Sequence, residues 1–178
     1  MILPRLPGTY VFIGRLAAPT AIIVGRLGRI AFPAGDYAYV GSAFGPGGIT
    51  ARVSHHLAAS TRPRWHLDYL RPRLTPLAVW FTTDARSHEH AWADALSGIR
   101  GAGLPCPGFG SSDCACQSHL IRFRRLPAVA TFRRHIAGSH ISGTYEIRFE
   151  AVAAAVNTGC STTAKRLKIG ANFVKGRP

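Results

Sequence analysis

Acidic residues are scarce in this sequence. Its 178 residues include 8 Asp and Glu against 22 Lys and Arg, which gives a formal net charge of +14. A field of this sign attracts polyanions, and phosphate backbones are the commonest of them. We therefore expect a nucleic-acid partner, and we favour it over an anionic membrane surface because no basic amphipathic helix is evident.

Long apolar runs and a secretory leader are also missing. No run approaches the roughly 20 residues that a membrane-spanning helix needs. The opening letters, MILPRLPGTY, carry neither a secretory h-region nor a cleavage site, so we expect a cytoplasmic protein. Hydrophobic residues still make up 47% of the chain, which is enough for the core of one domain and excludes wholesale disorder.

Cysteine is rare, and the four present are Cys106, Cys114, Cys116 and Cys160. In a cytoplasmic protein such residues are more often reduced thiols or metal ligands than disulfides. Cys106, Cys114 and Cys116, together with His119, could hold a structural Zn²⁺ through soft thiolates and an imidazole. The Cys-x-Cys spacing is tight for one tetrahedral ion, so reduced thiols are the interpretation we favour.

The order of apolar patterns predicts an α+β domain, with a small antiparallel-rich mixed sheet flanked by helices. Segments rich in β-branched and aromatic residues, separated by Gly and Pro, predict strands. One expected helix has Ser87 as its N-cap and Gly98 near its end. The expected strands are 9–16, 21–32 (broken by glycines), 33–43, 76–83 and 120–126, and the expected helices are 49–60, 65–71 and 84–99.

Residues 1–135 make up this predicted domain, and residues 136–178 form a basic, poorly ordered C-terminal extension. Its last part, 151–178, contains five Lys or Arg and no acidic residue. Such a tail would add non-specific attraction to phosphates.

One carboxylate stands where it could hold a metal ion. The chain has only three glutamates, and Glu89 lies near the start of the expected helix 84–99, between His88 and His90. Taken alone, Glu89 is explained as a carboxylate that the helix macrodipole favours. As an oxygen ligand it could also hold the hard divalent cation that phosphodiester hydrolysis usually needs.

Two further pairs of residues have a chemical and a plain interpretation. Arg52 and His56 lie four residues apart on one helix face, where they could hold a phosphate and orient a proton carrier, or form a solvated basic face. Tyr10 and Tyr39 could lie side by side if their strands pair. A polarised phenol there could act as a general base, whereas the plain interpretation is two tyrosines at the edge of the core.

The order of these residues is more specific than any of them alone. Gly-Thr-Tyr at 8–10, Tyr-Val-Gly at 39–41, Arg52 with His56, and then Glu89 resemble the motifs of the GIY-YIG nuclease superfamily. The segments FPAGDYAYVGSA, WHLDYL and GFGSSDCACQSHL resemble one uncharacterised branch of it, which is sometimes fused to an endonuclease III-type glycosylase. The resemblance covers roughly residues 8–125.

The resemblance implies a metal-dependent endonuclease, a hydrolase that cuts phosphodiester bonds in DNA more than in RNA and that acts in DNA repair. It implies one divalent ion, Mg²⁺ or else Mn²⁺, on Glu89. It places Tyr10 or Tyr39 as the base with His56 close by, and Arg52 at the scissile phosphate. In-line hydrolysis would leave 5′-phosphate and 3′-hydroxyl ends. The alternative is a nucleic-acid-binding module on the same fold that does not cut.

Three further side chains are candidates for the cleft. Ser42 follows Tyr-Val-Gly at a position where many relatives of the resembled family carry lysine. His66 and Asp68 belong to WHLDY, residues 65–69, and could line the cleft. The alternative, which we favour here, is a helix that buries its aromatic residues and pairs His66 with Asp68.

Overall fold

The computed structural model describes residues 1–58, 62–138 and 146–152. Its centre is an antiparallel sheet of five strands in the order β6-β4-β1-β5-β7. The strands are β1 (Thr9–Leu16), β4 (Gly35–Ser42), β5 (Thr75–Thr82), β6 (Leu120–Phe123) and β7 (Arg148–Ala151). With the helices described next, this confirms the predicted α+β class.

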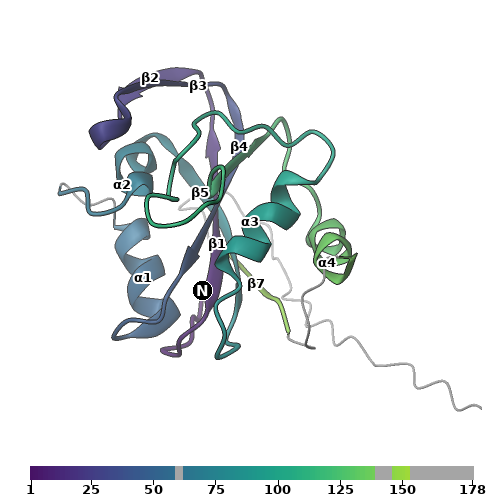
Figure 1. Ribbon diagram of the computed structural model, residues 1–178. Coiled ribbons are helices and arrows are strands. Elements are labelled where there is room, and N and C mark those ends of the chain that lie inside the picture. The colour runs from purple at the N-terminus through teal and green to yellow at the C-terminus, as the bar shows by residue number, and fades with distance from the viewer. Residues whose placement is uncertain (59–61, 139–145, 153–178) are drawn as a thin grey trace, which may run out of the picture.

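Helices cover both faces of the sheet (Figure 1). Helices α1 (Gly48–Leu57) and α2 (His66–Leu70) pack on one face, and α3 (Glu89–Ser97) and α4 (Val129–Gly138) pack on the other. A separate hairpin, β2 (Thr20–Ile23) and β3 (Arg29–Phe32), encloses the 3-10 turn η1 (Gly25–Leu27), and a second 3-10 turn, η2 (Arg71–Arg73), follows α2.

The alternation of side chains along β1 creates two hydrophobic clusters. Tyr10 and Phe12 face α1 and α2, whereas Val11 and Ile13 face α3 and α4. Successive side chains of a strand point to opposite faces of the sheet. Helices cover both faces here, so all four side chains are buried. The central strand thus carries a polar hydroxyl, that of Tyr10, into the face covered by α1.

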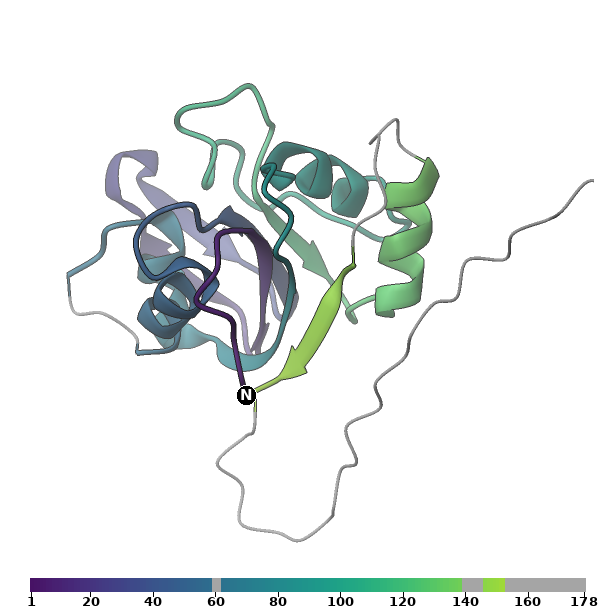
Figure 2. The same ribbon diagram turned by 90° about the horizontal axis from the view of Figure 1, so that it is seen from below.

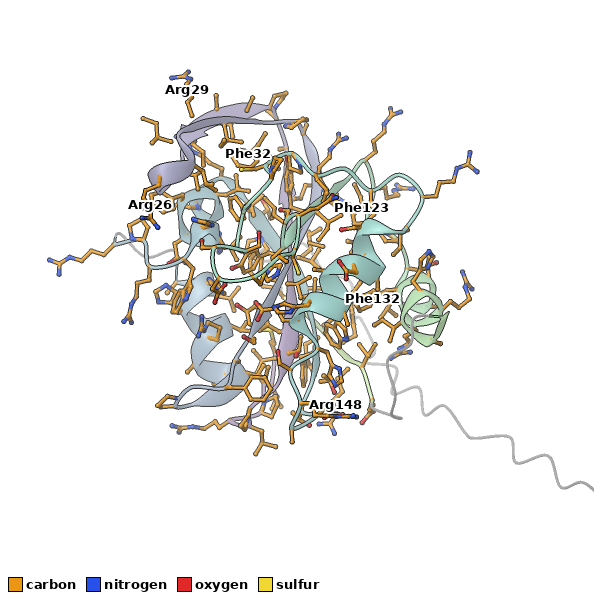
Figure 3. All side chains as sticks on the ribbon, in the orientation of Figure 1. Arg26, Arg29, Phe32, Phe123, Phe132 and Arg148 are labelled. Carbon is orange, nitrogen blue, oxygen red and sulfur yellow. The ribbon has the colours of Figure 1, made fainter. Side chains whose placement is uncertain are left out.

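Aromatic contacts fix α4 against the second face of the sheet. The ring of Phe132 stacks on Trp80 of β5 at a centroid distance of 5.2 Å and makes an edge-on contact with Trp92 of α3 at 5.3 Å. Arg26 in η1 and Arg29 at the start of β3 are exposed, and Figure 3 shows Arg29 pointing away from the body of the protein.

The chain before β1 closes the N-terminal end of α1 (Figure 2). The amide of Ile49 donates to the carbonyl of Leu6 at 2.9 Å, and the amide of Thr50 donates to the carbonyl of Pro4 at 3.1 Å. The hydroxyl of Thr50 also donates to the carbonyl of Leu3 at 2.7 Å. Backbone carbonyls therefore satisfy amides that a helix end leaves unpaired.

The sheet and helices continue beyond the predicted domain boundary at residue 135. That position falls inside α4, and β7 pairs with β5 at the edge of the sheet. The extension predicted from residue 136 therefore begins too early. A four-residue edge strand with three exposed positions carries no buried alternation that a sequence pattern could reveal. The predicted tail over 153–178 lies outside the described residues.

The start of α3 is also one residue later than predicted. His88, not Ser87, occupies the N-cap position, while Gly98 is the C-cap as expected. The amide of His88 donates to the hydroxyl of Thr9 at 2.9 Å, which ties the helix entrance to the first residue of β1. Among the described residues, no helix is both long and apolar enough to cross a membrane.

Candidate active site

A polar cavity of about 420 Å³ opens between α1, α2, α3 and the sheet. The residues that line it are spread along the sequence from position 10 to position 113. Its lining consists of Tyr10, Tyr39, Gly41, Ser42, Arg52, Arg64, Trp65, His66, Glu89, Gly110, Ser112 and Asp113. Sequence analysis had singled out Tyr10, Tyr39, Ser42, Arg52, His66 and Glu89, and the fold brings all six to this one cavity.

The two tyrosines lie on the same face of adjacent strands. Strand β1 pairs with β4 so that Tyr10 stands opposite Gly41 and Tyr39 stands opposite Phe12. The phenol of Tyr10 lies directly across Gly41, and a Cβ at that glycine would overlap the phenol oxygen. The glycine of the Tyr-Val-Gly motif is therefore needed to make room for the tyrosine of the other motif.

Burial sets the protonation of both phenols. It raises the pKa of Tyr10 well above its usual value, and the nearby Tyr39 adds to this effect. Burial also raises the pKa of Tyr39, with Glu89 contributing in the same direction. Both side chains are thus neutral phenols at pH 7, and neither is a ready-made phenolate base.

Tyr10 is the tyrosine with a built proton acceptor. Its hydroxyl lies 2.8 Å from Nε2 of His56, and Nδ1 of the same imidazole lies 3.2 Å from Oδ1 of Asp68. His56 and Asp68 are 1% and 2% exposed, so this hydrogen-bonded chain runs through the core behind the cavity. We call Asp68, His56 and Tyr10 the proton relay.

The charge of Asp68 fixes the direction of the relay. Burial opposes ionisation of Asp68, but hydrogen bonds from His56 and from the backbone amide of Arg64, among others, hold its pKa well below the usual range. An ionised carboxylate only accepts hydrogen bonds, so Nδ1 of His56 carries the proton. Nε2 is then free to accept from the Tyr10 hydroxyl. Burial also lowers the pKa of His56, which keeps the imidazole neutral at pH 7.

Arg52 lines the cavity and lies on the same helix as His56. Its guanidinium stands 3.9 Å from the ring centroid of Trp65. A guanidinium stacked on a ring keeps its N–H donors in its own plane, parallel to the ring, where two of them can form a bidentate contact with a phosphate. The cavity therefore holds a cation in a defined orientation, close to the two phenols.

Glu89 is the first residue of α3 and reaches the cavity from the opposite side. Its Oε1 lies 3.3 Å from Nδ1 of His119. Burial opposes ionisation of Glu89, but the nearby His119 and the hydroxyl of Ser42 outweigh it and lower the pKa of the carboxyl. Ser42 and Asp113 line the same cavity as Glu89, which thus offers hydroxyl and carboxylate oxygens, the ligands that a hard, largely hydrated cation such as Mg²⁺ takes.

The WHLDY segment divides between the cavity and the core. His66 lines the cavity, and its Nδ1 accepts a hydrogen bond from the amide of Gly110 at 2.8 Å. Asp68 does not line it and does not pair with His66. Instead, its Oδ2 lies 3.0 Å from Nε2 of His55. The carboxylate also contacts His56 and accepts from the backbone amides of Arg64 and Trp65. Both the cleft assignment of Asp68 and the favoured His66–Asp68 pair were therefore wrong.

The predicted zinc residues do not all come together. Cys106 is 2% exposed, packs in the core on the α1 side of the sheet, and donates toward the carbonyl of Pro107. Cys114, Cys116 and His119 are close together, and His90 of α3 joins them in place of Cys106. Burial raises the pKa of the Cys116 thiol, and the neighbouring Cys114 raises it further, to about 12. Cys160 lies outside the described residues.

Within residues 1–58, 62–138 and 146–152, two groups of side chains are arranged closely enough to hold a metal ion: His90 with Cys114, Cys116 and His119, and His55 with His56 and Asp68. In the second group the ring nitrogens already face Asp68 and Tyr10 as hydrogen-bond partners. That group is better described as the end of the proton relay than as a metal site.

Several cavity residues were missed by sequence analysis. Arg64 and Asp113 line the cavity without having been predicted, and His119, predicted only as a zinc ligand, lies against Glu89. The stacked pair of Arg52 and Trp65 has no signal in the sequence, because the two residues come from different helices. A signal for His90 was present in the letters HEH, where it directly follows Glu89.

The family model described as domain of unknown function DUF123 matches residues 9–140. The matched stretch includes every residue that lines the cavity, all three residues of the proton relay, and the four-residue cluster around His119. No curated protein and no solved structure matches the chain.

Proposed function

The chain belongs to the DUF123 family, and we propose that it is a metal-dependent endonuclease that hydrolyses phosphodiester bonds in nucleic acid, with DNA as the preferred substrate. One observation carries the proposal. Tyr10, Tyr39, Arg52 and Glu89, which come from four separate elements, line one cavity in a protein with a formal net charge of +14. Their chemistry matches the roles that the GIY-YIG resemblance implies for them.

The proton relay supplies the base. An attacking water gives its proton to the oxygen of Tyr10 while the phenol's own proton passes to Nε2 of His56. The imidazolium that forms is stabilised by Asp68, which holds the opposite nitrogen. No phenolate is needed at any stage, which agrees with the raised pKa of the buried phenol.

The remaining groups act on the phosphate. The water oxygen forms its bond to phosphorus as the bond to the 3′ oxygen breaks, and that oxygen takes a proton from solvent. Arg52, oriented by Trp65, binds the phosphoryl oxygens whose charge increases in the transition state. A divalent ion bound by Glu89 would add Lewis-acid stabilisation of the same charge. The products carry 5′-phosphate and 3′-hydroxyl ends.

Recognition is proposed to depend on backbone and shape. The cavity presents guanidinium, hydroxyl and aromatic groups, which suit phosphates and a stacked base. The strong positive charge predicts that binding weakens steeply with salt, as counterion release requires. A role in DNA repair and a cytoplasmic location belong to the same proposal.

The test is a cleavage assay on labelled single-stranded, duplex and branched DNA and on RNA, with and without Mg²⁺ or Mn²⁺. We expect cleavage of DNA that needs the metal and that Glu89→Gln abolishes while binding survives. Glu146→Gln is the matched control, because it removes the same charge from an exposed carboxylate outside the cavity. Binding without cleavage of any substrate would support the non-catalytic module instead.

A second matched pair tests the tyrosine. Tyr10→Phe should lose cleavage, whereas Tyr37→Phe should retain it. Tyr37 lies on the same face of the sheet, and its hydroxyl donates to the carbonyl of Pro33 rather than to the relay. Equal cleavage by the two variants would remove Tyr10 from the mechanism.

A further inference from the structure

The group of potential metal ligands formed by His90, Cys114, Cys116 and His119 lies next to Glu89, and none of the four lines the cavity. His90 belongs to α3, Cys114 and Cys116 belong to the loop before β6, and His119 directly precedes that strand. One ligand atom from each residue lies within 4.8 Å of every other. The four donors converge from two segments that are 24 residues apart at their nearest ends, between His90 and Cys114.

We propose that these four residues bind one structural Zn²⁺ that locks the loop before β6 onto α3. Two thiolates and two imidazoles are the donor set that zinc prefers in structural sites. Bond lengths of about 2.0 to 2.3 Å in a tetrahedron place neighbouring ligand atoms about 3.3 to 3.8 Å apart. Sγ of Cys114 already lies 3.4 Å from Nε2 of His119, within that range.

Backbone hydrogen bonds fix the loop that carries Cys114, Cys116 and His119. The amide of His119 donates to the carbonyl of Phe109 at 2.8 Å, and its carbonyl accepts from Val40 of β4 at 2.9 Å. The amide of Gly108 donates to the carbonyl of Gln117 at 2.8 Å, so a hydrogen bond joins the beginning of the loop to its end. Despite the Cys-x-Cys spacing, the ligand atoms of Cys114 and Cys116 lie within 4.8 Å of each other and of those of His119 and His90.

The zinc site also sets the position of Glu89. With Nε2 of His119 on the ion, Nδ1 carries the proton and faces Oε1 of Glu89 at 3.3 Å. Carboxylates commonly support a metal-bound histidine in this way. This consequence for Glu89 rests on the proposed nuclease function, whereas the zinc site itself does not.

The probe is Co²⁺, added to reduced, metal-free full-length protein under anaerobic conditions and followed by displacement with Zn²⁺. We expect one equivalent to bind with the intense visible bands of tetrahedral cobalt and the near-ultraviolet charge transfer of two thiolates. Cys106→Ser is the matched control and should bind as the wild type does. Cys114→Ser, Cys116→Ser and His90→Asn should each weaken binding by at least about 100-fold, and the two serine variants should lose half of the charge-transfer intensity.

A readout on the unmodified protein covers the case in which a variant fails to fold. Zn²⁺ should raise the midpoint of thermal unfolding of the metal-free wild type, and a chelator should reverse the rise. The proposal is overturned if the wild type binds no stoichiometric Co²⁺ or Zn²⁺, if Cys106→Ser alone abolishes binding, or if Cys114→Ser and Cys116→Ser bind unchanged. None of these outcomes depends on cleavage, so the zinc site and the nuclease proposal can fail separately.

Discussion

Replacing Asp68 by Asn should reverse the direction of the hydrogen bonds in the proton relay, while the new side chain keeps the position of the old one. Oδ2 of Asp68 accepts from the amides of Arg64 at 2.9 Å and Trp65 at 3.1 Å. The oxygen of an Asn would keep those two bonds. Its amide group would then face Nδ1 of His56 and donate to it, which forces the ring proton onto Nε2. Nε2 would donate to Tyr10, and the phenol could no longer pass its proton inward.

The expected loss in kcat is about 100- to 10,000-fold, the range that a positioned general base contributes. The free energy of unfolding should fall by about 1 to 3 kcal/mol, because the hydrogen bonds of His55 and His56 to a buried charge become bonds to a neutral amide. Tyr10→Phe should show a similar loss in kcat. The double variant should be no slower than Tyr10→Phe alone, because both changes interrupt one chain of proton transfer.

Two measurements check this reasoning. Single-turnover cleavage at saturating metal gives the rates, and nitrogen NMR of labelled histidine reports which ring nitrogen of His56 carries the proton. The NMR readout does not require that the protein cut DNA. A kcat within threefold of the wild type, losses that multiply in the double variant, or an unchanged His56 tautomer in Asp68→Asn would each refute the relay.

Three further outcomes follow from the same structure. Arg52→Lys keeps the charge but loses the planar group stacked on Trp65, so DNA affinity at fixed ionic strength should drop about 2- to 30-fold; equal affinity would exclude a role for the stacking. Gly41→Ala places a methyl group against Tyr10 and should lower the free energy of unfolding in urea by about 1 to 3 kcal/mol; an unchanged free energy would refute the need for glycine at this position. Burial lowers the pKa of His56, so the unfolded chain takes up its proton first, near pH 6.5. Stability should therefore fall as pH decreases below about 6.5, with His56 contributing up to about 1.4 kcal/mol per pH unit, and His56→Gln should reduce this slope in urea titrations over a pH series, leaving the part from His66, whose pKa burial also lowers.

The residues that sequence analysis placed correctly in the cavity share one property. Tyr10, Tyr39 and Glu89 each stand at a position that local rules define, on a strand face or at a helix start. Once β1 and β4 pair, the register alone brings the two tyrosines to one face. The order of the motifs along the chain supplied the rest of the prediction.

The errors have a different origin, because they concern contacts between distant segments. His90 replaces Cys106 among the potential zinc ligands only because α3 packs beside the loop before β6. Asp68 turns toward His55 and His56 because α1 and α2 are neighbours on the same face of the sheet. Helix α4 was not predicted at all, and its two buried residues, Phe132 and Ile136, leave a weak helical pattern. No spacing in a single sequence specifies such pairings.

The carbonyls of Leu6 and Pro4 have a practical consequence for anyone preparing this protein. They occupy the amides of Ile49 and Thr50, so the positive end of α1 is closed to any incoming phosphate. Deleting the segment ahead of β1 would uncap the helix that carries both Arg52 and His56, and it would open an anion site that the intact chain does not offer. We therefore expect a form without the first eight residues to bind anions such as sulfate or phosphate at this helix end, so a binding assay on a shortened form would report a site that the capped helix lacks.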